Sequence, residues 1–336
     1  MKELWKNQRI AVVGATGIVG KELLFLLQEK QICSLFLYAR KKKALRIKDT
    51  TYSVEALEDA SFKDIDFVFL CAGSCISEKL WNHFPSDLCV IDLSSKYRLD
   101  PKVPLVLPEV NRELLRSFPN KITSPNCIVS LLLPVLYPLY QKFPVKKLVL
   151  STYQAASGGG QKLLQTLLQE TREFYEGKTP SKPYAFSLYP HNSHLLENGQ
   201  VEEEAKIQAE VRKILQNPTL EISVNAVRVP VIRAHSISLH IEFEKEAPLS
   251  EVRSLLENAE GVFLWEENQD PLLMTPFEVS NKSLIFCGRL RKSCKNSLDL
   301  WIVGDQLLKG AALNALQIAE NLLILRNSHV LEEKNA

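Results

Sequence analysis

The chain has 336 residues, of which 46% are hydrophobic and 24% are charged, and its formal net charge is +2. This length predicts two domains with a core each, and this composition is typical of a soluble globular protein. The near-neutral charge carries no signature of nucleic-acid binding, and the longest apolar stretch, residues 128–140, is too short to span a membrane. We therefore expect neither a nucleic acid nor a membrane as a partner.

Seven cysteines are spread along the chain without a Cys-x-x-Cys pair or a common zinc-binding spacing. The N-terminal residues lack the features of a secretory signal peptide. These observations favour a cytoplasmic protein with reduced thiols. His191 and His194 are three residues apart, but their polar, proline-containing surroundings predict a loop, so we expect no metal site.

The first predicted strand, residues 10–13, leads into the turn Gly14-Ala15-Thr16-Gly17-Ile18-Val19-Gly20, and a helix is predicted over residues 18–30. Strand, glycine-rich turn and helix in this order predict a phosphate-binding helix N-terminus. Glycines let the backbone approach a pyrophosphate, and the free N–H groups attract its charge. An ordinary tight turn between a strand and a helix is the alternative.

The second predicted strand, residues 35–39, indicates which dinucleotide would bind. An NAD site usually ends this strand with an acidic residue that hydrogen-bonds the ribose 2′-hydroxyl. Here four cations, Arg40 to Lys43, follow the strand instead. They suit the 2′-phosphate of NADP, and a solvated basic turn is the alternative.

Further strands are predicted over residues 66–71 and 88–93, with a helix over residues 77–84 between them. Apolar strands that alternate with helices predict a parallel sheet with helices on both faces, and a nucleotide beyond the carboxyl ends of the strands. Arg98 follows the last of these strands, where it would either bind an anion or lie solvated on the surface.

Cys127 follows Ser124-Pro125-Asn126 and precedes the apolar stretch, so it is predicted in the first turn of a buried helix. A helix N-terminus favours a thiolate, and Asn126 is placed to cap the helix or to donate its amide to an oxyanion. His235 is the natural acid–base partner for such a nucleophile. The alternatives are a small buried cysteine and a core histidine.

The second half of the chain predicts an α+β domain with an antiparallel or mixed sheet. Helices are predicted over residues 158–176, 201–215 and 249–258, and strands over residues 224–231, 236–244, 283–290 and 297–303. A last helix, residues 305–325, would pack back onto the first domain, and the polar tail from Arg326 would fray. The fold class expected is therefore α/β: a Rossmann-type parallel-sheet domain, residues 1–126 plus 305–330, and an α+β domain, residues 127–304.

Six sequence blocks, in this order, resemble those of the aspartate-β-semialdehyde dehydrogenase family over nearly the whole chain. They are Gly14–Gly17, Pro104–Asn111, Pro125–Cys127, Ser151–Gly158, Arg228–Ser236 and Lys309–Asn314. The family interconverts L-aspartyl 4-phosphate and L-aspartate 4-semialdehyde with NADPH, an early step towards lysine and diaminopimelate, methionine and threonine. The resemblance implies this activity, NADP as the cofactor, and a homodimer or homotetramer built on the second domain, which would be the catalytic and dimerisation domain.

The resemblance also implies a role for each site residue. Cys127 would be the nucleophile that forms an acyl-thioester, Gln154 would position it, and His235 would be the acid–base catalyst, with Asn126 beside the nucleophile. The substrate ligands would be Arg228 for the α-carboxylate, Glu204 for the ammonium group, and Arg98 and Lys206 for the phosphate. The cofactor would contact Gly14, Thr16, Gly17, Ile18, Val19, Arg40, Lys41, Ser157, Gly158 and Gln306.

Some positions make this assignment less direct. Glu204 and Lys206 are two residues apart, which is about 200° on an ideal helix, so Glu204 could instead only complement the helix dipole. Four residues also depart from the family pattern in ways that affect cofactor geometry and rate rather than the reaction class: Leu93, Ser74, Ile128 and Gln306.

Two other functions stay open. One is the related N-acetyl-γ-glutamyl-phosphate reductase, which uses the same cysteine and histidine chemistry on a longer acyl phosphate. The Ser-Thr-Tyr-Gln block and the pair Glu204 and Lys206 argue against it. The other is a non-catalytic NADP-binding relative. The presence of Cys127, Gln154, Arg228 and His235 argues against a relative that has lost its chemistry.

Overall fold

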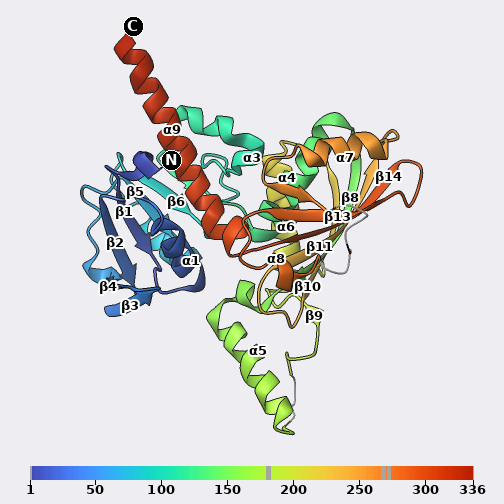
Figure 1. Cartoon of the computed structure of the whole chain (residues 1–336), viewed down its shortest axis with the longest axis horizontal. Coiled ribbons are helices and arrows are strands. Elements are labelled where there is room, and N and C mark those ends of the chain that lie inside the picture. Colours follow the sequence, from blue (N-terminus) through green and yellow to red (C-terminus); the bar gives the residue numbers. More distant parts are fainter. Residues whose placement is uncertain (1, 179–182, 266–269, 271–273, 336) are drawn as a thin grey trace. The chain divides into compact units, whose positions relative to one another are not determined.

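The computed structural model describes residues 2–178, 183–265, 270 and 274–335 (Figure 1). The chain divides into two compact units: unit 1 comprises Met1–Pro125 and Ala311–Ala336, and unit 2 comprises Asn126–Gly310. Asn126 and residues 305–310, which were predicted in the first domain, lie in unit 2.

Within the described residues, unit 1 holds a seven-stranded sheet whose neighbouring strands are parallel, except for the antiparallel hairpin β3–β4. The order is β3 (Lys43–Ile47), β4 (Thr50–Ala56), β2 (Ser34–Ala39), β1 (Arg9–Val13), β5 (Phe67–Leu70), β6 (Cys89–Asp92) and β7 (Lys121–Thr123). The predicted Rossmann-type sheet is confirmed. The hairpin was not predicted; β3 begins inside the basic run, because Leu45 and Ile47 alternate with exposed residues and bury one side of the strand.

Helices cover both faces of this sheet. The helices of unit 1 are α1 (Ile18–Leu27), α2 (Ser74–Leu80), α3 (Pro108–Asn111) and α9 (Leu313–Asn335), with 3₁₀ turns at Lys2–Trp5, Leu57–Asp59 and Arg112–Ser117. Val12 of β1 lies in one core with Leu23 of α1 and Leu316 of α9. Val13, the next residue, faces the opposite core with Trp81, which follows α2. This alternation is what a strand buried on both faces requires.

The last helix differs from the prediction at both ends. A turn and then a π-helical segment, Leu308–Ala312, precede α9, so the helix starts later than residue 305. The predicted fraying from Arg326 is wrong: α9 runs to Asn335, because residues 326–335 contain neither glycine nor proline and include leucine, glutamate and lysine, which favour a helix. In the described part of the chain, every helix is too short or too polar to cross a membrane.

Unit 2 holds, within the described residues, a second seven-stranded sheet, which is mixed as predicted. The order is β12 (Val262–Leu264), β13 (Ile285–Arg291), β14 (Ser297–Gly304), β11 (His235–Phe243), β8 (Val145–Gln154), β10 (Glu221–Arg228) and β9 (Tyr189–Pro190). The pairs β12/β13 and β8/β10 are parallel and the others are antiparallel. The strand β8 was not predicted, although it lies between β11 and β10.

Two helices of unit 2, α4 (Cys127–Lys142) and α6 (Glu202–Ile214), begin close to the sheet. Unit 2 also has α5 (Gly160–Tyr175), α7 (Leu249–Glu257) and α8 (Pro276–Val279), with a 3₁₀ turn at Ala156–Gly159. The buried helix predicted from the apolar stretch is α4. It packs against α6, which in turn packs against β10. The first turns of α6 therefore lie within reach of the N-terminus of α4.

Candidate active site

Three strand ends meet at one edge of the unit 2 sheet. The strand β8 ends at Gln154, its parallel neighbour β10 ends at Arg228, and these two residues are register partners. The strand β11 begins at His235 and runs antiparallel to β8, so its first residues lie beside the last residues of β8. The predicted strand over residues 224–231 ends early because Pro230 has no N–H to extend the ladder. Gln154, Arg228 and His235 are thereby brought together.

Cys127 is the first residue of α4, as predicted. Asn126 is the N-cap of this helix: its Oδ1 accepts the N–H of Ile128 at 2.8 Å. The free N–H groups and the dipole of a first helical turn stabilise an anion, which favours the thiolate of a cysteine placed there. The side chain of Cys127 is partly exposed and forms no disulfide. A partly exposed thiol at this position can act as a nucleophile.

Asn126 is held through each of its polar groups. Its backbone N–H donates to Oε2 of Glu210 at 2.6 Å, and its Nδ2 donates to Oε1 of Glu203 at 2.9 Å. Its carbonyl accepts the N–H of Ser130 at 2.9 Å. Gln154 joins the same group, because its Nε2 donates to Oε1 of Glu203 at 3.2 Å. A single carboxylate therefore links the N-cap of the cysteine helix to the end of β8.

Glu204, the expected ammonium ligand, and its neighbour Glu203 have different partners in the structure. The carboxylate of Glu204 accepts the N–H of Val201 at 3.0 Å and the N–H of Ala226 at 2.9 Å, so it caps α6 and ties this helix to β10. Glu203, one residue earlier, is the side chain that reaches Asn126 and Gln154. A turn of about 100° per residue separates the two carboxylates, which is why only one of them faces the site.

Lys206 lies on the same side of α6 as Glu203, because three residues on a helix differ by only about 60°. Its Nζ forms an ion pair with Glu202 at 2.7 Å. Partly exposed pairs of this kind are weak, so an arriving anion can compete for the ammonium group. The spacing Glu203-x-x-Lys206 was the signal in the sequence that could have identified Glu203.

His235 presents one ring nitrogen to the site. The N–H of Ala155 donates to Nδ1 of His235 at 3.0 Å. Nε2 is buried and has no hydrogen-bond partner among the residues that the structure describes. Burial lowers the pKa of His235 well below its usual value, and the charge of Arg228 acts in the same direction. The resting ring is therefore neutral, and because Nδ1 accepts a hydrogen bond, its proton is on Nε2.

Arg228 is a buried cation with a histidine beside it. Nη1 donates to the carbonyl of Ala155 at 2.9 Å, and Nη2 lies 2.5 Å from Nε2 of His191. Burial, followed by the charge of Arg228, lowers the pKa of His191 to about 4, so this ring is neutral and can accept from the guanidinium. Burial also lowers the pKa of Arg228, which the nearby charges of Cys127 and Glu203 oppose. Sequence reasoning considered His191 only as a metal ligand.

Two of the expected cofactor residues in unit 2 hold the loop before His235. Oγ of Ser157 donates to the carbonyl of Ile232 at 2.6 Å and accepts from Nε2 of Gln306 at 2.6 Å. Oε1 of Gln306 accepts the N–H of Ala234 at 2.8 Å. Ala234 has a φ of 69°, which is uncommon for a residue with a side chain, and Gln306 stabilises it there. A contact between Gln306 and the cofactor stays a prediction.

Gly158 lies against the ring of His235. A Cβ atom on Gly158 would be 2.9 Å from both Cε1 and Nε2 of His235 and 3.4 Å from Nη1 of Arg228. Any side chain at this position would have to displace the histidine ring. The glycine therefore sets the position of Nε2, in addition to the cofactor contact predicted for it.

In unit 1, the glycine turn has the geometry of a phosphate-binding turn. Gly14 has a φ of 87°, and a Cβ on it would be 2.7 Å from the backbone of Cys71 at the end of β5. Gly17 is the N-cap of α1, and the helix begins at Ile18 and Val19 without a side-chain cap from the described residues. The first N–H groups of α1 are thus available to an anion such as a pyrophosphate.

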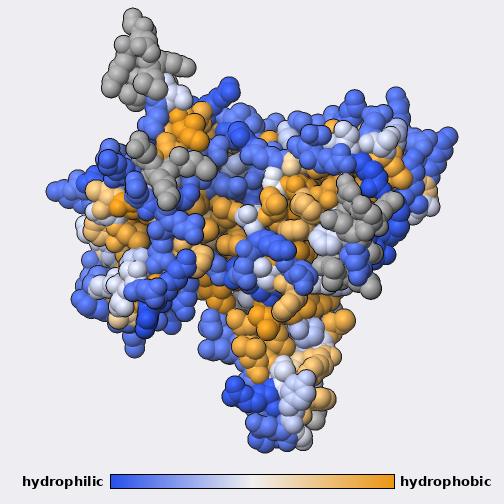
Figure 2. Space-filling model, viewed as in Figure 1, coloured by the Kyte–Doolittle hydropathy of each residue, from blue (hydrophilic) through white to orange (hydrophobic). Residues whose placement is uncertain are grey.

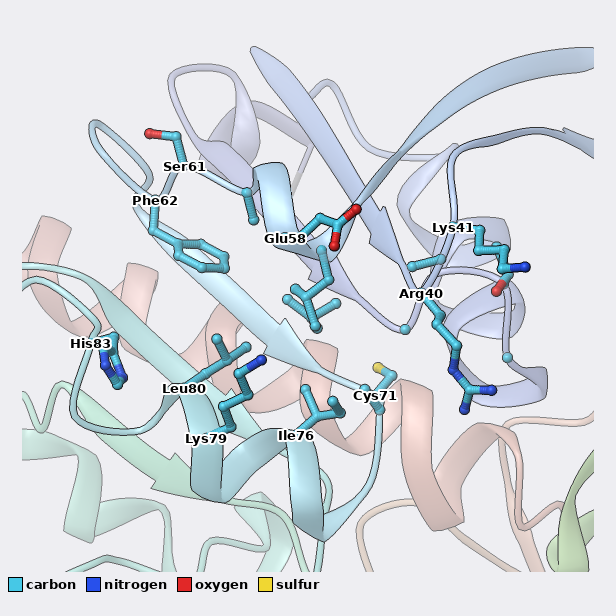
Figure 3. Close-up of a pocket in the computed structure, with 18 of the residues that line it drawn as sticks. Arg40, Lys41, Glu58, Ser61, Phe62, Cys71, Ile76, Lys79, Leu80 and His83 are labelled. Atoms are coloured by element: carbon cyan, nitrogen blue, oxygen red, sulfur yellow. The ribbon is translucent and has the colours of Figure 1, made fainter.

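A cavity of about 1330 Å³ adjoins this turn within unit 1 (Figure 3). Figure 3 shows Arg40 and Lys41 on one side of it and Ile76 and Lys79 of α2 on another. Gly14, Thr16, Gly17, Lys43, Glu58 and Phe62 also line the cavity. Lys42 instead forms an ion pair with Glu55 at 2.7 Å. Three of the four consecutive cations therefore line a cavity that is large enough for a nucleotide.

Arg98 lies in a loop of unit 1 that a buried carboxylate organises. Asp92, at the end of β6, accepts from Oγ of Ser77 at 2.8 Å and from the N–H and Oγ of Ser94 at 2.8 and 2.9 Å. Burial raises the pKa of Asp92, and these hydrogen bonds act against the shift. The guanidinium of Arg98 donates to the carbonyl of Leu93 at 2.8 Å. Asp92 was not recognised in the sequence, and it fixes the loop that carries Arg98.

The predicted residues thus fall into two groups. Unit 2 brings Cys127 with its N-cap, Gln154, Arg228 and His235 into one site, and adds Glu203 and His191 to it. Glu210 lies behind the site, where it holds the backbone of Asn126. Unit 1 carries the glycine turn, the cations after β2 and Arg98. No group of three or more potential metal ligands occurs in the part of the chain that the structure describes.

Two family models match the chain. Residues 9–118 match the NAD binding domain of semialdehyde dehydrogenase, and residues 136–309 match the semialdehyde dehydrogenase dimerisation domain. A protein of Prochlorococcus marinus named aspartate-semialdehyde dehydrogenase is 42% identical over 328 residues, which cover 94% of this chain and 95% of that protein. A protein of the same name from Aquifex aeolicus is 40% identical over 332 residues, covering 94% and 98%.

Solved structures agree with this similarity. The crystal structure of aspartate semialdehyde dehydrogenase II from Vibrio cholerae has a TM-score of 0.89 and 32% identity, covering 94% of this chain and 98% of that one. A structure of that enzyme complexed with ASA has the same TM-score and 31% identity. The resemblance and the fold class inferred from the sequence are confirmed. The chain belongs to the aspartate-semialdehyde dehydrogenase family, and it is an oxidoreductase of amino-acid biosynthesis with an NAD(P)-binding Rossmann-type domain.

Proposed function

We propose that this enzyme reduces L-aspartyl 4-phosphate to L-aspartate 4-semialdehyde with NADPH, through an acyl-thioester on Cys127. The observation that carries the proposal is the arrangement in unit 2: a cysteine at a helix N-terminus, with Gln154, Arg228 and His235 at the adjoining sheet edge. The product would supply lysine and diaminopimelate, methionine and threonine synthesis. The seven free cysteines fit a reducing cytoplasm.

The substrate would be held by its two charged α-substituents. The guanidinium of Arg228 would bind the α-carboxylate through a bidentate fork, displacing or sharing its contact with His191. The carboxylate of Glu203 would bind the ammonium group. Arg98 and Lys206 would bind the phosphate. The Vibrio cholerae relative was solved in complex with ASA, which supports the binding of such a ligand by this enzyme.

The chain's own residues would then perform the covalent steps. The thiolate of Cys127 attacks the acyl carbon, and the bond between this carbon and the phosphate oxygen breaks. Phosphate is released, and the acyl group remains on Cys127 as a thioester. NADPH, when bound, supplies the hydride that reduces this thioester to a thiohemiacetal. Nε2–H of His235 donates a hydrogen bond to the substrate oxygen as negative charge develops on it. It keeps this hydrogen bond while the thiohemiacetal oxyanion re-forms the carbonyl, expels the thiolate of Cys127 and releases the aldehyde. Gln154, anchored on Glu203, keeps the thiol and the substrate aligned.

The reverse reaction tests this proposal. Purified enzyme is mixed with L-aspartate semialdehyde, phosphate and NADP, and NADPH absorbance is followed, with Cys127→Ser as the control. Phosphate-dependent NADPH formation that the variant lacks supports the reaction and the nucleophile. Turnover of N-acetylglutamate semialdehyde but not of the aspartate compound would favour the related reductase. Inactivity with both substrates and with either nicotinamide cofactor would favour a non-catalytic, nucleotide-binding relative.

NADP is the dinucleotide that the cavity of unit 1 suits best. The glycine turn offers N–H groups to the pyrophosphate, and Arg40, Lys41 and Lys43 line the cavity where β2 ends. No acidic residue ends β2 to bond a ribose hydroxyl. Glu58 also lines the cavity, and it is the group that would bond a hydroxyl if NAD were bound instead. Ser157 and Gly158 are the further cofactor contacts that the family resemblance implies.

The enzyme would act as a homodimer or homotetramer assembled through unit 2, which matches the family's dimerisation domain. Figure 2 shows apolar residues gathered over the part of unit 2 that carries α5. Large apolar side chains are exposed on and after α5, at Leu168, Phe174, Tyr175, Phe186 and Leu188. A second copy would remove this surface from water. Light scattering coupled to gel filtration measures the oligomeric state. A monomer at micromolar concentration would overturn the proposed assembly.

A further inference from the structure

Glu210 is a buried carboxylate that the proposed chemistry does not use. Only 1% of its surface is exposed, and it lies on α6 with Ile207, Val211 and Ile214, which are also buried. Carboxylates are rarely buried to this extent unless a specific partner compensates for the lost hydration. One such partner is the backbone N–H of Asn126, which donates to Oε2 of Glu210 at 2.6 Å.

This hydrogen bond is made at a sensitive position of the backbone. Asn126 precedes the proposed nucleophile Cys127 and is the N-cap of its helix, with extended backbone angles of φ −54° and ψ 146°. At this residue the chain changes from an extended segment to a helix. Small rotations there would swing the side chain of Cys127 by a larger amount. A contact that fixes the N–H of Asn126 therefore also restricts the direction of the thiol.

The second carboxylate that holds Asn126 cannot do this alone. Glu203 accepts from the side chain of Asn126, but it also accepts from Gln154, and it is the group proposed to bind the substrate ammonium. Its hydrogen bonds must therefore rearrange when substrate binds. Glu210, seven residues later and so on the same side of α6, contacts the backbone of Asn126 instead. It can keep the N-cap in place while Glu203 exchanges partners.

We propose that Glu210 is a positioning residue for the nucleophile: it fixes the N-cap Asn126 and thereby the approach of Cys127 to the acyl carbon. This inference rests on the proposed function, because it takes Cys127 as the nucleophile. It assigns Glu210 no contact with the substrate. Its loss should therefore reduce kcat and alter thiol reactivity while leaving substrate binding largely intact.

Two substitutions separate the hydrogen bond from the charge. Glu210→Asp keeps the charge but withdraws the carboxylate by one methylene group, so it loses the contact with Asn126. Glu210→Gln removes the charge but retains an acceptor oxygen at the same distance. Glu204→Asp is the matched control, because Glu204 lies on the same helix and also accepts backbone N–H groups, yet contacts Val201 and Ala226 rather than Asn126.

The readouts are kcat and KM in the reverse reaction, the rate of Cys127 alkylation by iodoacetamide measured by mass spectrometry, and thermal unfolding. We expect Glu210→Asp to lower kcat about tenfold or more and to change the alkylation rate, with KM within about threefold. Glu210→Gln should stay within about threefold of wild type in both rates. Glu204→Asp should lower the unfolding temperature without changing the alkylation rate.

Each outcome decides the inference. Wild-type rates in Glu210→Asp, or an equal loss in Glu210→Gln and Glu210→Asp, would overturn it, the latter because charge rather than position would then matter. If Glu210→Asp does not fold, Glu210→Gln still tests the inference, because a loss of its rates would overturn it. Failure of the proposed function is recognised separately: Cys127→Ser would then remain active, or wild type would show no turnover.

Discussion

The N–H of Ala155 donates to Nδ1 of His235 at 3.0 Å, and this single hydrogen bond determines which nitrogen of the histidine carries the proton. Ala155 directly follows Gln154 at the end of β8, so the strand that positions one site residue also sets the tautomer of another. The ring then carries an Nε2–H group, which is the donor proposed for the substrate oxygen.

The activity of His235 variants should depend on whether the new side chain places an N–H group where Nε2–H lies. Glutamine can place an amide N–H near the position of Nε2, whereas asparagine is too short. We expect His235→Asn to lower kcat about a hundredfold or more and His235→Gln to retain clearly more activity. Steady-state kinetics of the reverse reaction provide the measurement. Equal losses in both variants would argue against donation from Nε2.

An alanine at position 158 should disturb the same ring. Its Cβ would be 2.9 Å from Nε2 of His235, so the ring must move, and we expect kcat to fall about tenfold or more. Gly159→Ala is the matched control, because there the new Cβ meets the side chain of Leu163, which can rotate away. If Gly158→Ala raised only the KM for NADP, the residue would act through the cofactor alone.

Glu203→Gln and Glu204→Gln should have different effects although the residues are adjacent. Glu203→Gln should raise the KM for the semialdehyde about tenfold or more, because a charged partner of the ammonium group is lost. Glu204→Gln should leave KM near wild type and reduce stability by about 1 kcal/mol, because it weakens a helix cap. Kinetics combined with urea unfolding distinguish the two. The reverse pattern would favour Glu204 as the ligand.

The cations after β2 should control the choice of dinucleotide. Replacing Arg40 and Lys41 together with serine should raise the KM for NADP about tenfold or more, since charged hydrogen bonds to the 2′-phosphate are lost, and should affect NAD little. Lys42→Ser is the control: Lys42 pairs with Glu55 and does not line the cavity. An unchanged preference in the double variant would show that this basic turn is only solvated.

Acid should destabilise unit 2 through two histidines. The pKa of His191 is lowered to about 4 and that of His235 is also lowered, so neither is protonated in the folded state near pH 5, whereas both are protonated after unfolding. Since the unfolded state binds more protons, stability falls as the pH drops from about 6.5 towards 4, by up to about 1.4 kcal/mol per pH unit for each ring. Urea unfolding at several pH values measures this slope. His191→Gln should reduce it; an unchanged slope would mean that His191 does not contribute.

Elements whose residues follow a clear local pattern were predicted from the sequence. Elements that mix apolar and charged residues were missed. The glycine turn and the cysteine at the start of α4 were found because their residues are required locally, by a sharp turn and by a helix N-terminus. The strand β8 was missed because its first half carries two lysines, although its alternate residues Leu148 and Leu150 are buried. Its role depends on neighbours that are distant in the chain.

Site residues that act through tertiary contacts were the hardest to predict. Glu203 and Glu204 have the same side chain and adjoining positions, and only the rotation of α6 relative to α4 and β10 assigns one to the site and the other to a cap. Asp92, His191 and Glu210 acquire their roles from partners on other elements. No local pattern marks such residues.

Unit 1 is built from two separate stretches of the chain, so it cannot be completed until the C-terminal stretch has been synthesised. The core beneath β1 is completed by residues of α9, among them Ala315, Leu316 and Ile318, which leave the ribosome only after the whole of unit 2. Until then, the part of the first sheet's face that α9 covers stays exposed, although α1 packs beside it. Unit 2 is contiguous and can close first, so the dinucleotide-binding unit should be the last part of the nascent chain to mature, and chains truncated before α9 should expose an apolar surface that chaperones recognise.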